Sequence, residues 1–170
     1  GGLAVNAHVS ITLDANALVN LAGAVFIAPF MLFSASAGQL ADKFEKSRLI
    51  RAIKLFEIAI MAVGLAGFWM RDLATLFTAL ALMGVHSTLF GPVKYAILPQ
   101  HLKPEELVGG NGLVEMGTFV AILAGTIAGG LVVGTGSNGP LWAGALAIAI
   151  AVAGWFASRA IPETPAVDPN

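Results

Sequence analysis

Long stretches without a single charged residue constrain this chain more than any other feature. No Asp, Glu, Lys or Arg occurs between Asp14 and Asp42, between Asp72 and Lys94, or between Glu115 and Arg159. A membrane-spanning helix needs about 20 consecutive, mainly apolar residues, and each of these stretches is long enough to supply them. With 57% hydrophobic and 11% charged residues, the chain has too much apolar surface for a water-soluble domain. The pattern therefore indicates an integral membrane protein.

The charged residues divide the chain into five spans, at about residues 17–40, 50–70, 73–93, 111–133 and 141–158. The last uncharged stretch is too long for one span, and its Gly-rich segment 134–140 supplies the turn. The apolar runs are continuous rather than alternating, so they predict helices and exclude the strands of a membrane barrel. We expect an all-α membrane protein with five transmembrane helices, whose bundle occupies residues 17–160 and is followed by a non-helical linker at 161–170.

Lysine and arginine residues gather on one side of the predicted spans. That side holds Lys43, Lys46, Arg48, Arg51, Lys54, Lys94, Lys103 and Arg159, whereas the other side has only Arg71. Because cytoplasmic loops carry an excess of Lys and Arg, we expect residues 1–17 to lie outside the cell membrane and residues 161–170 inside. Residues 1–17 show no signal-peptide pattern, so this orientation predicts a further span upstream. Five spans plus one make half of a twelve-helix transporter; a protein of five spans is the alternative.

The loop after the first span has the sequence Gly-Gln-Leu-Ala-Asp-Lys-Phe-Glu-Lys-Ser-Arg over residues 38–48. Gly38 permits close helix approach, Asp42 can face the positive N-terminus of a neighbouring helix, and cations such as Lys43 and Arg48 anchor the turn. The loop resembles the signature between the second and third helices of the major facilitator superfamily, with Lys43 in place of the usual Arg and Glu45 in place of the second Gly. The resemblance implies that the five spans correspond to helices 2–6 of a twelve-helix fold, and that Asp42 takes part in gating. The partners it implies are the first helix and the C-terminal half of the same protein.

A stripe of small residues lies within the fourth predicted span. Gly117, Ala121, Gly125 and Gly129 recur every four residues, a spacing that lets membrane helices pack closely, and Gly130 follows directly. The segment 125–130 also resembles a Gly-Pro-x-x-Gly-Gly stretch of antiporters in the same superfamily, with Thr126 in the proline position. A drug or metabolite antiporter is therefore an alternative function.

Two further stretches are more specific. Pro92-Val-Lys94-Tyr95-Ala-Ile-Leu and, beginning the next helix, Asn111-Gly-Leu-Val-Glu115 resemble the lysophospholipid transporter family of this superfamily. The resemblance extends over residues 30–130. It implies a carrier, in the bacterial inner membrane, that moves a lysophospholipid such as lysophosphatidylethanolamine between leaflets for re-acylation, either free or fused to an acyltransferase.

A carrier of this kind needs a cation for the phosphate and an apolar face for the acyl chain. Lys94 is the candidate cation, and Glu115 could neutralise it or bind an ammonium group, with Asn111 one turn earlier on the same helix. His86 falls near the middle of its span, where we expect a neutral ring that is bonded to Ser or Thr and lines the path. The alternatives are a Lys94 that only extends to the headgroup layer and a Glu115 paired to a neighbouring helix. Lys54 and Glu57 are three residues apart and predict a structural ion pair.

Other functions find no support in the sequence. The chain has no cysteine, and its three histidines have no metal-site spacing. It contains no nucleophile elbow and no P-loop, so we predict no enzyme activity and no cofactor. A net charge of −1 gives no basic character for nucleic acid. Two alternatives remain. In the first, the chain is the transporter domain of a protein fused to an acyltransferase, and the acyltransferase is then a partner of this chain. In the second, it is a membrane scaffold that does not transport.

Overall fold

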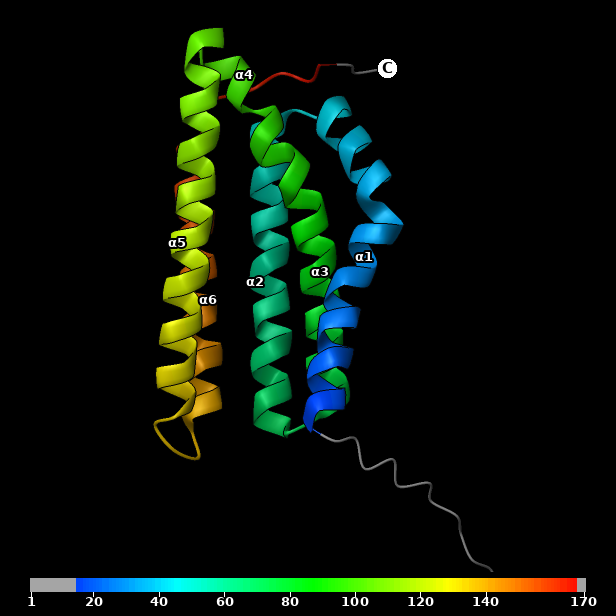
Figure 1. Cartoon of the computed structure of the whole chain (residues 1–170), viewed down its shortest axis with the longest axis vertical. Helices are drawn as coiled ribbons and strands as arrows, with labels where there is room; N and C mark the ends of the chain where they lie inside the picture. The colour runs from blue at the N-terminus through cyan, green and yellow to red at the C-terminus, as the bar shows by residue number, and fades with distance from the viewer. Residues whose placement is uncertain (1–14, 168–170) are drawn as a thin grey trace, which may run out of the picture.

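The computed structural model describes residues 15–167, and all regular elements in this range are helical. Five long helices account for most of it: α1 (Ala15–Lys43), α2 (Lys46–Met70), α3 (Leu73–Ala96), α5 (Leu107–Val133) and α6 (Gly139–Ser158) (Figure 1). Between α3 and α5 lie a one-turn helix, α4 (Leu98–His101), and a 3-10 turn, η1 (Pro104–Glu106). The predicted segment 1–17 falls almost entirely outside the described residues.

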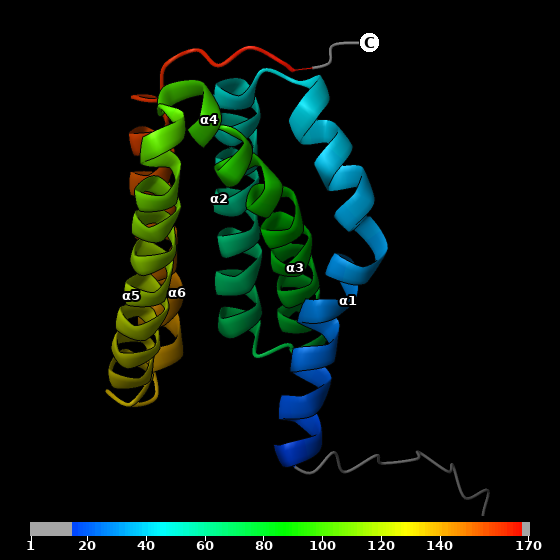
Figure 2. The same cartoon turned by 45° about the horizontal axis from the view of Figure 1, so that its top comes forward.

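The helices form a bundle in which α2 has the central position. It packs against α3 on one side and α6 on the other, while α1 runs along α3. Figures 1 and 2 show α1 and the α5–α6 pair on opposite sides of the α2–α3 pair. Helix α5 touches α6 and α4 but makes little contact with the other long helices, and none of its residues is buried.

The two ends of the bundle differ in character. We call the end with the α1–α2 turn, α4 and residues 159–167 the basic end, because it carries most of the cations. The far end carries the α2–α3 turn at Arg71 and Asp72 and the α5–α6 turn at residues 134–138. In Figure 1 the basic end is at the top and the far end at the bottom.

Four helical stretches are long and apolar enough to cross a membrane: Asn16–Lys43, Leu73–His101, Pro104–Val133 and Gly139–Ser158. The other long helix, α2, has 25 residues but carries five charged side chains in its first half (Lys46, Arg48, Arg51, Lys54 and Glu57). Its place between α3 and α6 protects part of this polar surface. The architecture is that of an all-α, multi-pass membrane protein.

The helices extend beyond the predicted spans at the basic end. Helix α1 continues to Lys43 rather than residue 40, α2 begins at Lys46 rather than 50, and α5 begins at Leu107 rather than 111. A charged residue interrupts the apolar pattern but not the backbone hydrogen bonds of a helix, so apolarity alone underestimates helix length. The sequence also did not predict α4 and η1, where Pro99 and Pro104 occupy first-turn positions that need no N–H donor.

Two long helices approach each other closely at Gly84 of α3. A Cβ atom at this position would collide with the backbone oxygen of Phe26 and would lie 3.0 Å from Cγ of Pro29. Pro29 is buried in the middle of α1, and Figure 1 shows that α1 bends about midway along its length. A proline removes one helix hydrogen bond and favours such a bend. Gly84 and Pro29 therefore bring α1 against α3.

We expect Gly84→Ala to destabilise the protein by about 1–3 kcal/mol, because the added methyl group must push α1 away from α3. Thermal unfolding of the detergent-solubilised protein would measure the change. Gly91→Ala is the matched control on the same helix, since its Cβ would meet no atom within 4 Å, and alanine is the better helix former. Equal stability of the two variants would contradict the proposed close contact.

Candidate functional site

Lys94, the predicted phosphate-binding cation, lies in the last turn of α3 at the basic end. Its Nζ donates a hydrogen bond to Oγ1 of Thr118 on α5 at 3.1 Å and lies 4.8 Å from the centre of the Tyr95 ring. The side chain is half-buried, and among the described residues no carboxylate pairs with it. Lys94 is thus a cation held between two helices that forms no ion pair within the described chain.

The face of α5 that Lys94 contacts carries the other polar residues predicted nearby. Asn111, Glu115 and Thr118 are spaced four and three residues apart, so they lie on one face of the helix. Glu115 is half-buried and Asn111 is exposed. The Thr118 hydroxyl donates to the Val114 carbonyl at 2.8 Å, which leaves its oxygen free to accept from Lys94. Thr118 was not predicted from the sequence, although a threonine three residues after Glu115 in an apolar helix was the available signal.

His86 lies deeper in the bundle and has a different partner from the one expected. Its Nε2 is 3.5 Å from Oε2 of Glu57 on α2, and its ring stacks on Phe90 at 5.9 Å. Neither ring nitrogen makes a hydrogen bond within the described part of the chain, so the predicted bond to Ser or Thr is wrong. The neighbouring Thr88 hydroxyl donates instead to the Gly84 carbonyl.

The predicted ion pair between Lys54 and Glu57 is confirmed. Nζ of Lys54 lies 2.7 Å from Oε2 of Glu57, and both side chains are largely buried. Lys54 also lies 4.9 Å from the centre of the Phe90 ring. The same carboxylate oxygen therefore faces Lys54 and His86. His86 and Lys94 are eight residues apart, about 12 Å along the helix axis, so the structure does not bring these two site candidates into contact.

The loop predicted from the signature forms the α1–α2 turn, but its helix-capping acid is not Asp42. Glu45 accepts hydrogen bonds from the backbone N–H groups of Ser47 at 2.9 Å and Arg48 at 2.8 Å, and so caps α2. The side chains of Asp42, Lys43 and Arg48 are exposed. A Cβ at Gly38 would meet nothing within 4 Å, so the described chain brings no helix close to it. The gating role of Asp42 stays a prediction.

The segment after α6 lies across this turn. We call residues 161–167 the C-terminal strap, which is extended and non-helical. The Thr164 N–H donates to Glu45 Oε1 at 2.6 Å, and its carbonyl accepts from the Lys46 N–H at 2.9 Å. The Thr164 hydroxyl lies 2.8 Å from Nε2 of His101 in α4. The strap therefore joins the α1–α2 turn to the α3–α5 connection.

These contacts change the acidity of Glu45. Partial burial acts to raise the pKa of its carboxyl, but hydrogen bonds from Thr164, Arg48 and Ser47 outweigh it and lower the pKa from 4.5 to about 2. The charged form of Glu45 is therefore favoured by the folded protein.

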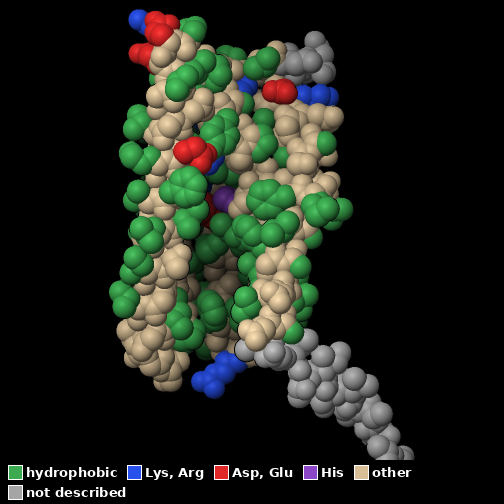
Figure 3. Space-filling model, in the orientation of Figure 1, with side chains coloured by type: hydrophobic (Ala, Val, Ile, Leu, Met, Phe, Trp, Pro, Cys, Tyr) green, Lys and Arg blue, Asp and Glu red, His purple; other side chains and the backbone are tan. Residues whose placement is uncertain are grey.

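The glycines of the predicted packing stripe have no close neighbour in the described structure. A Cβ at Gly117, Gly125, Gly129 or Gly130 would meet nothing within 4 Å. Figure 3 shows a hollow between α5 and the α1–α3 pair. Gly125 and Gly129 are seven and eleven residues after Thr118, so they share the face of α5 that Lys94 reaches.

Comparison with known proteins agrees with the architecture of an all-α membrane bundle. A model of the Major Facilitator Superfamily matches residues 3–170, and the chain belongs to this family. It is also 35% identical, over 146 residues, to the lysophospholipid transporters LplT of Salmonella heidelberg and of Salmonella typhi. The match covers 86% of this chain but only 34% of each relative. No solved structure is significantly similar to the chain.

The Lys54–Glu57 pair predicts a clear pattern of stabilities. Lys54→Met alone leaves a buried carboxylate without its closest cation, and we expect a loss of about 3 kcal/mol. The double variant Lys54→Met, Glu57→Gln removes both charges and should recover most of that loss. Chemical unfolding of the purified protein would measure both. A double variant no more stable than the single variant would show that the ion pair is not the reason for the loss.

For Glu45→Ala we expect a loss of about 1 kcal/mol at pH 7, because the helix cap and the bond to the strap disappear. Since folding lowers the pKa from 4.5 to about 2, this stabilisation is complete above pH 4.5 and is lost as the pH falls toward 2. Thermal unfolding at pH 7 and pH 3 should show the difference between parent and variant shrinking. Glu163→Ala, which changes an exposed strap residue, is the control; an equal loss in that variant would contradict the assignment.

Proposed function

We propose that this chain forms part of a secondary transporter that moves a lysophospholipid, such as lysophosphatidylethanolamine, across the bacterial inner membrane for re-acylation. The observation that carries the proposal is Lys94, a cation that has no carboxylate partner among residues 15–167 and whose Nζ donates a hydrogen bond to Thr118 on α5. A lysophospholipid has one phosphate and one acyl chain. Lys94 offers a charge for the phosphate, and the exposed apolar side chains of α5 offer a surface for the chain.

The hollow beside Lys94 supports a second part of the proposal. A further helix of the same protein would pack there, against the Gly125 and Gly129 face of α5, and the C-terminal half would close the path from the other side. Small residues let such a helix approach closely. Alternating access would then follow from rocking of the two halves, with Asp42 at the basic end acting in the gate.

The orientation is part of the same proposal. The excess of Lys and Arg puts the basic end, with Lys94 and the C-terminal strap, at the cytoplasmic face and the far end in the periplasm. The substrate would enter from the outer leaflet and leave near Lys94. An acyltransferase, either fused or separate, would act on it there.

The test is uptake of labelled lysophosphatidylethanolamine by spheroplasts that express the complete protein. We expect Lys94→Ala to reduce the initial rate about tenfold, because a charge-assisted contact to phosphate is lost, and Lys94→Arg to retain more activity. Lys103→Ala is the matched control: it removes an exposed basic-end lysine from η1's capping position and should leave uptake unchanged. Membrane abundance of each variant must be equal.

Three results would contradict parts of this proposal. No uptake by a well-expressed parent would remove the lysophospholipid assignment and favour the antiporter alternative, which a drug or metabolite efflux assay would then test. Uptake equally reduced in Lys94→Ala and Lys103→Ala would show a general effect of surface charge. Full uptake in Lys94→Ala would leave the transport assignment intact but exclude Lys94 from the path.

A further inference from the structure

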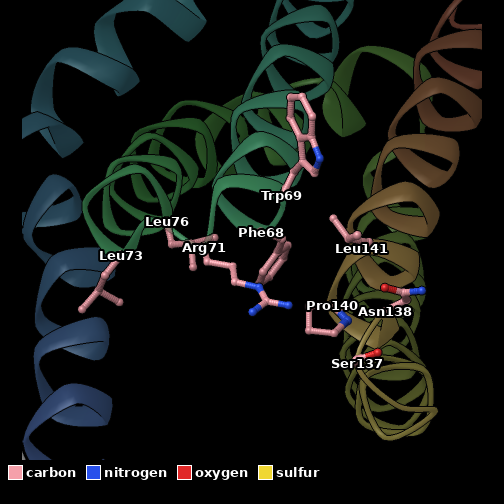
Figure 4. A pocket seen from close by; sticks show the side chains of 9 residues that line it. All are labelled: Phe68, Trp69, Arg71, Leu73, Leu76, Ser137, Asn138, Pro140 and Leu141. Atoms are coloured by element: carbon pink, nitrogen blue, oxygen red, sulfur yellow. The ribbon is translucent and has the colours of Figure 1, made fainter.

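A second cationic side chain beside a cavity, that of Arg71, lies at the opposite end of the bundle from Lys94. At the far end, the α2–α3 turn and the α5–α6 turn enclose a cavity of about 530 Å³. Its walls are largely apolar and include Phe68, Trp69 and Leu141. Figure 4 shows the side chain of Arg71 extending from the end of α2 toward Pro140, in the first turn of α6.

Three polar side chains that line this cavity are exposed. Among residues 15–167, nothing forms an ion pair or a hydrogen bond with the side chains of Arg71, Ser137 and Asn138. The adjacent acid, Asp72, is engaged elsewhere, because its carboxylate accepts from the Thr75 N–H and hydroxyl and caps α3. These bonds lower the pKa of Asp72, so it stays ionised in that position. Within the same described range, Arg71 is the only Lys or Arg of the far end.

The backbone conformation at Arg71 gives an independent reason to expect a function for its side chain. Arg71 follows the last residue of α2 with φ 53° and ψ 37°, and no other described non-glycine residue has a positive φ. Glycine is the usual residue at this position of a helix end, because a side chain in the left-handed region costs free energy. An arginine in place of glycine here is an outlier of the kind that points to a function of the side chain.

We infer that this cavity is a binding site for the phosphate headgroup of a single-chain phospholipid at the outer side of the membrane, before the lipid reaches Lys94. The inference rests on the proposed function and its orientation. The Arg71 guanidinium presents a planar fork of N–H donors that matches phosphate oxygens. The Asn138 amide and the Ser137 hydroxyl bond the glycerol and the remaining oxygens. The apolar wall of Trp69, Phe68 and Leu141 takes the first part of the acyl chain.

The position of the cavity suits the first step of a transport path. Arg71 lies just before the start of α3 and Lys94 lies in its last turn, so these two cations are separated by about 35 Å along the helix axis. This distance is close to the thickness of a bilayer. One cation therefore lies at each face of the membrane along the same helix. A phosphate would meet Arg71 on arrival and Lys94 on departure.

The experiment measures equilibrium binding of lysophosphatidylethanolamine to the complete protein in nanodiscs. Arg71→Gly is the main variant, because glycine suits the left-handed backbone and the protein should remain at least as stable as the parent. We expect its affinity to fall about tenfold, and that of Arg71→Lys to fall less. Asn138→Asp, which places a carboxylate among the residues that line the cavity and keeps an equally good residue at the N-cap of α6, should weaken binding similarly. Arg159→Gln is the matched control, since Arg159 lies at the basic end on the Trp155 ring.

Competition experiments show which part of the ligand the site recognises. Glycerophosphoethanolamine, which lacks the acyl chain, and inorganic phosphate should each displace the lysolipid weakly from the parent and not at all from Arg71→Gly. Monoacylglycerol, which lacks the phosphate, should not displace the fraction of binding that depends on Arg71. Unchanged affinity in Arg71→Gly, or the same loss in Arg159→Gln, would overturn the site while leaving the proposed function in place. Displacement by phosphate as strong as by the lysolipid would identify an anion site rather than a lipid site. A parent that binds no lysophospholipid would overturn the site and the proposed function together.

Discussion

The backbone of a chain in a bilayer must satisfy its own hydrogen bonds, and this constraint determines where everything else in the structure can be. A helical chain meets it by keeping its helices continuous within the apolar layer, so every turn between the long helices in residues 15–167 lies at one of the two ends. The ends are consequently the places where side chains and backbone groups are free to bind other molecules. Lys94 and Arg71, two cations that pair with no carboxylate of the described chain, both lie there.

Charges that remain inside the bundle are arranged differently. Lys54 and Glu57 neutralise each other at 2.7 Å, and His86 faces the same carboxylate. A buried charge without a partner would cost several kcal/mol, so the pairing explains how α2 keeps polar residues in its first half. The contrast between Lys54, which is paired, and Lys94, which is not, separates a structural lysine from a candidate binding lysine better than sequence position does.

The sequence predicted the long helices and their order well, because an uncharged run of about 20 residues has few other solutions in a membrane protein. It also predicted the Lys54–Glu57 pair, since residues three apart on a helix share a face. It did not predict the partner of His86, because Glu57 is on another helix and no local pattern records that contact. Glu45 was noted only as a departure from a loop signature, although an acid directly before Lys-Ser at a helix start can cap that helix. The strap and the Arg71 cavity depend on segments far apart in the chain, which only tertiary structure brings together.

The C-terminal strap has a consequence for how the sequence can vary. Nearly all of its bonds to the rest of the basic end use its own backbone: the carbonyls of Ile161, Thr164 and Pro165 accept, and the N–H groups of Thr164 and Val167 donate. Substitution of the exposed side chains of the strap therefore leaves these bonds intact, whereas proline at residue 164 or 167 would remove a donor. Homologous straps could diverge until no sequence similarity is detectable and still hold the same two turns together. Their common role would be recognisable from the path of the chain and not from the identity of its residues.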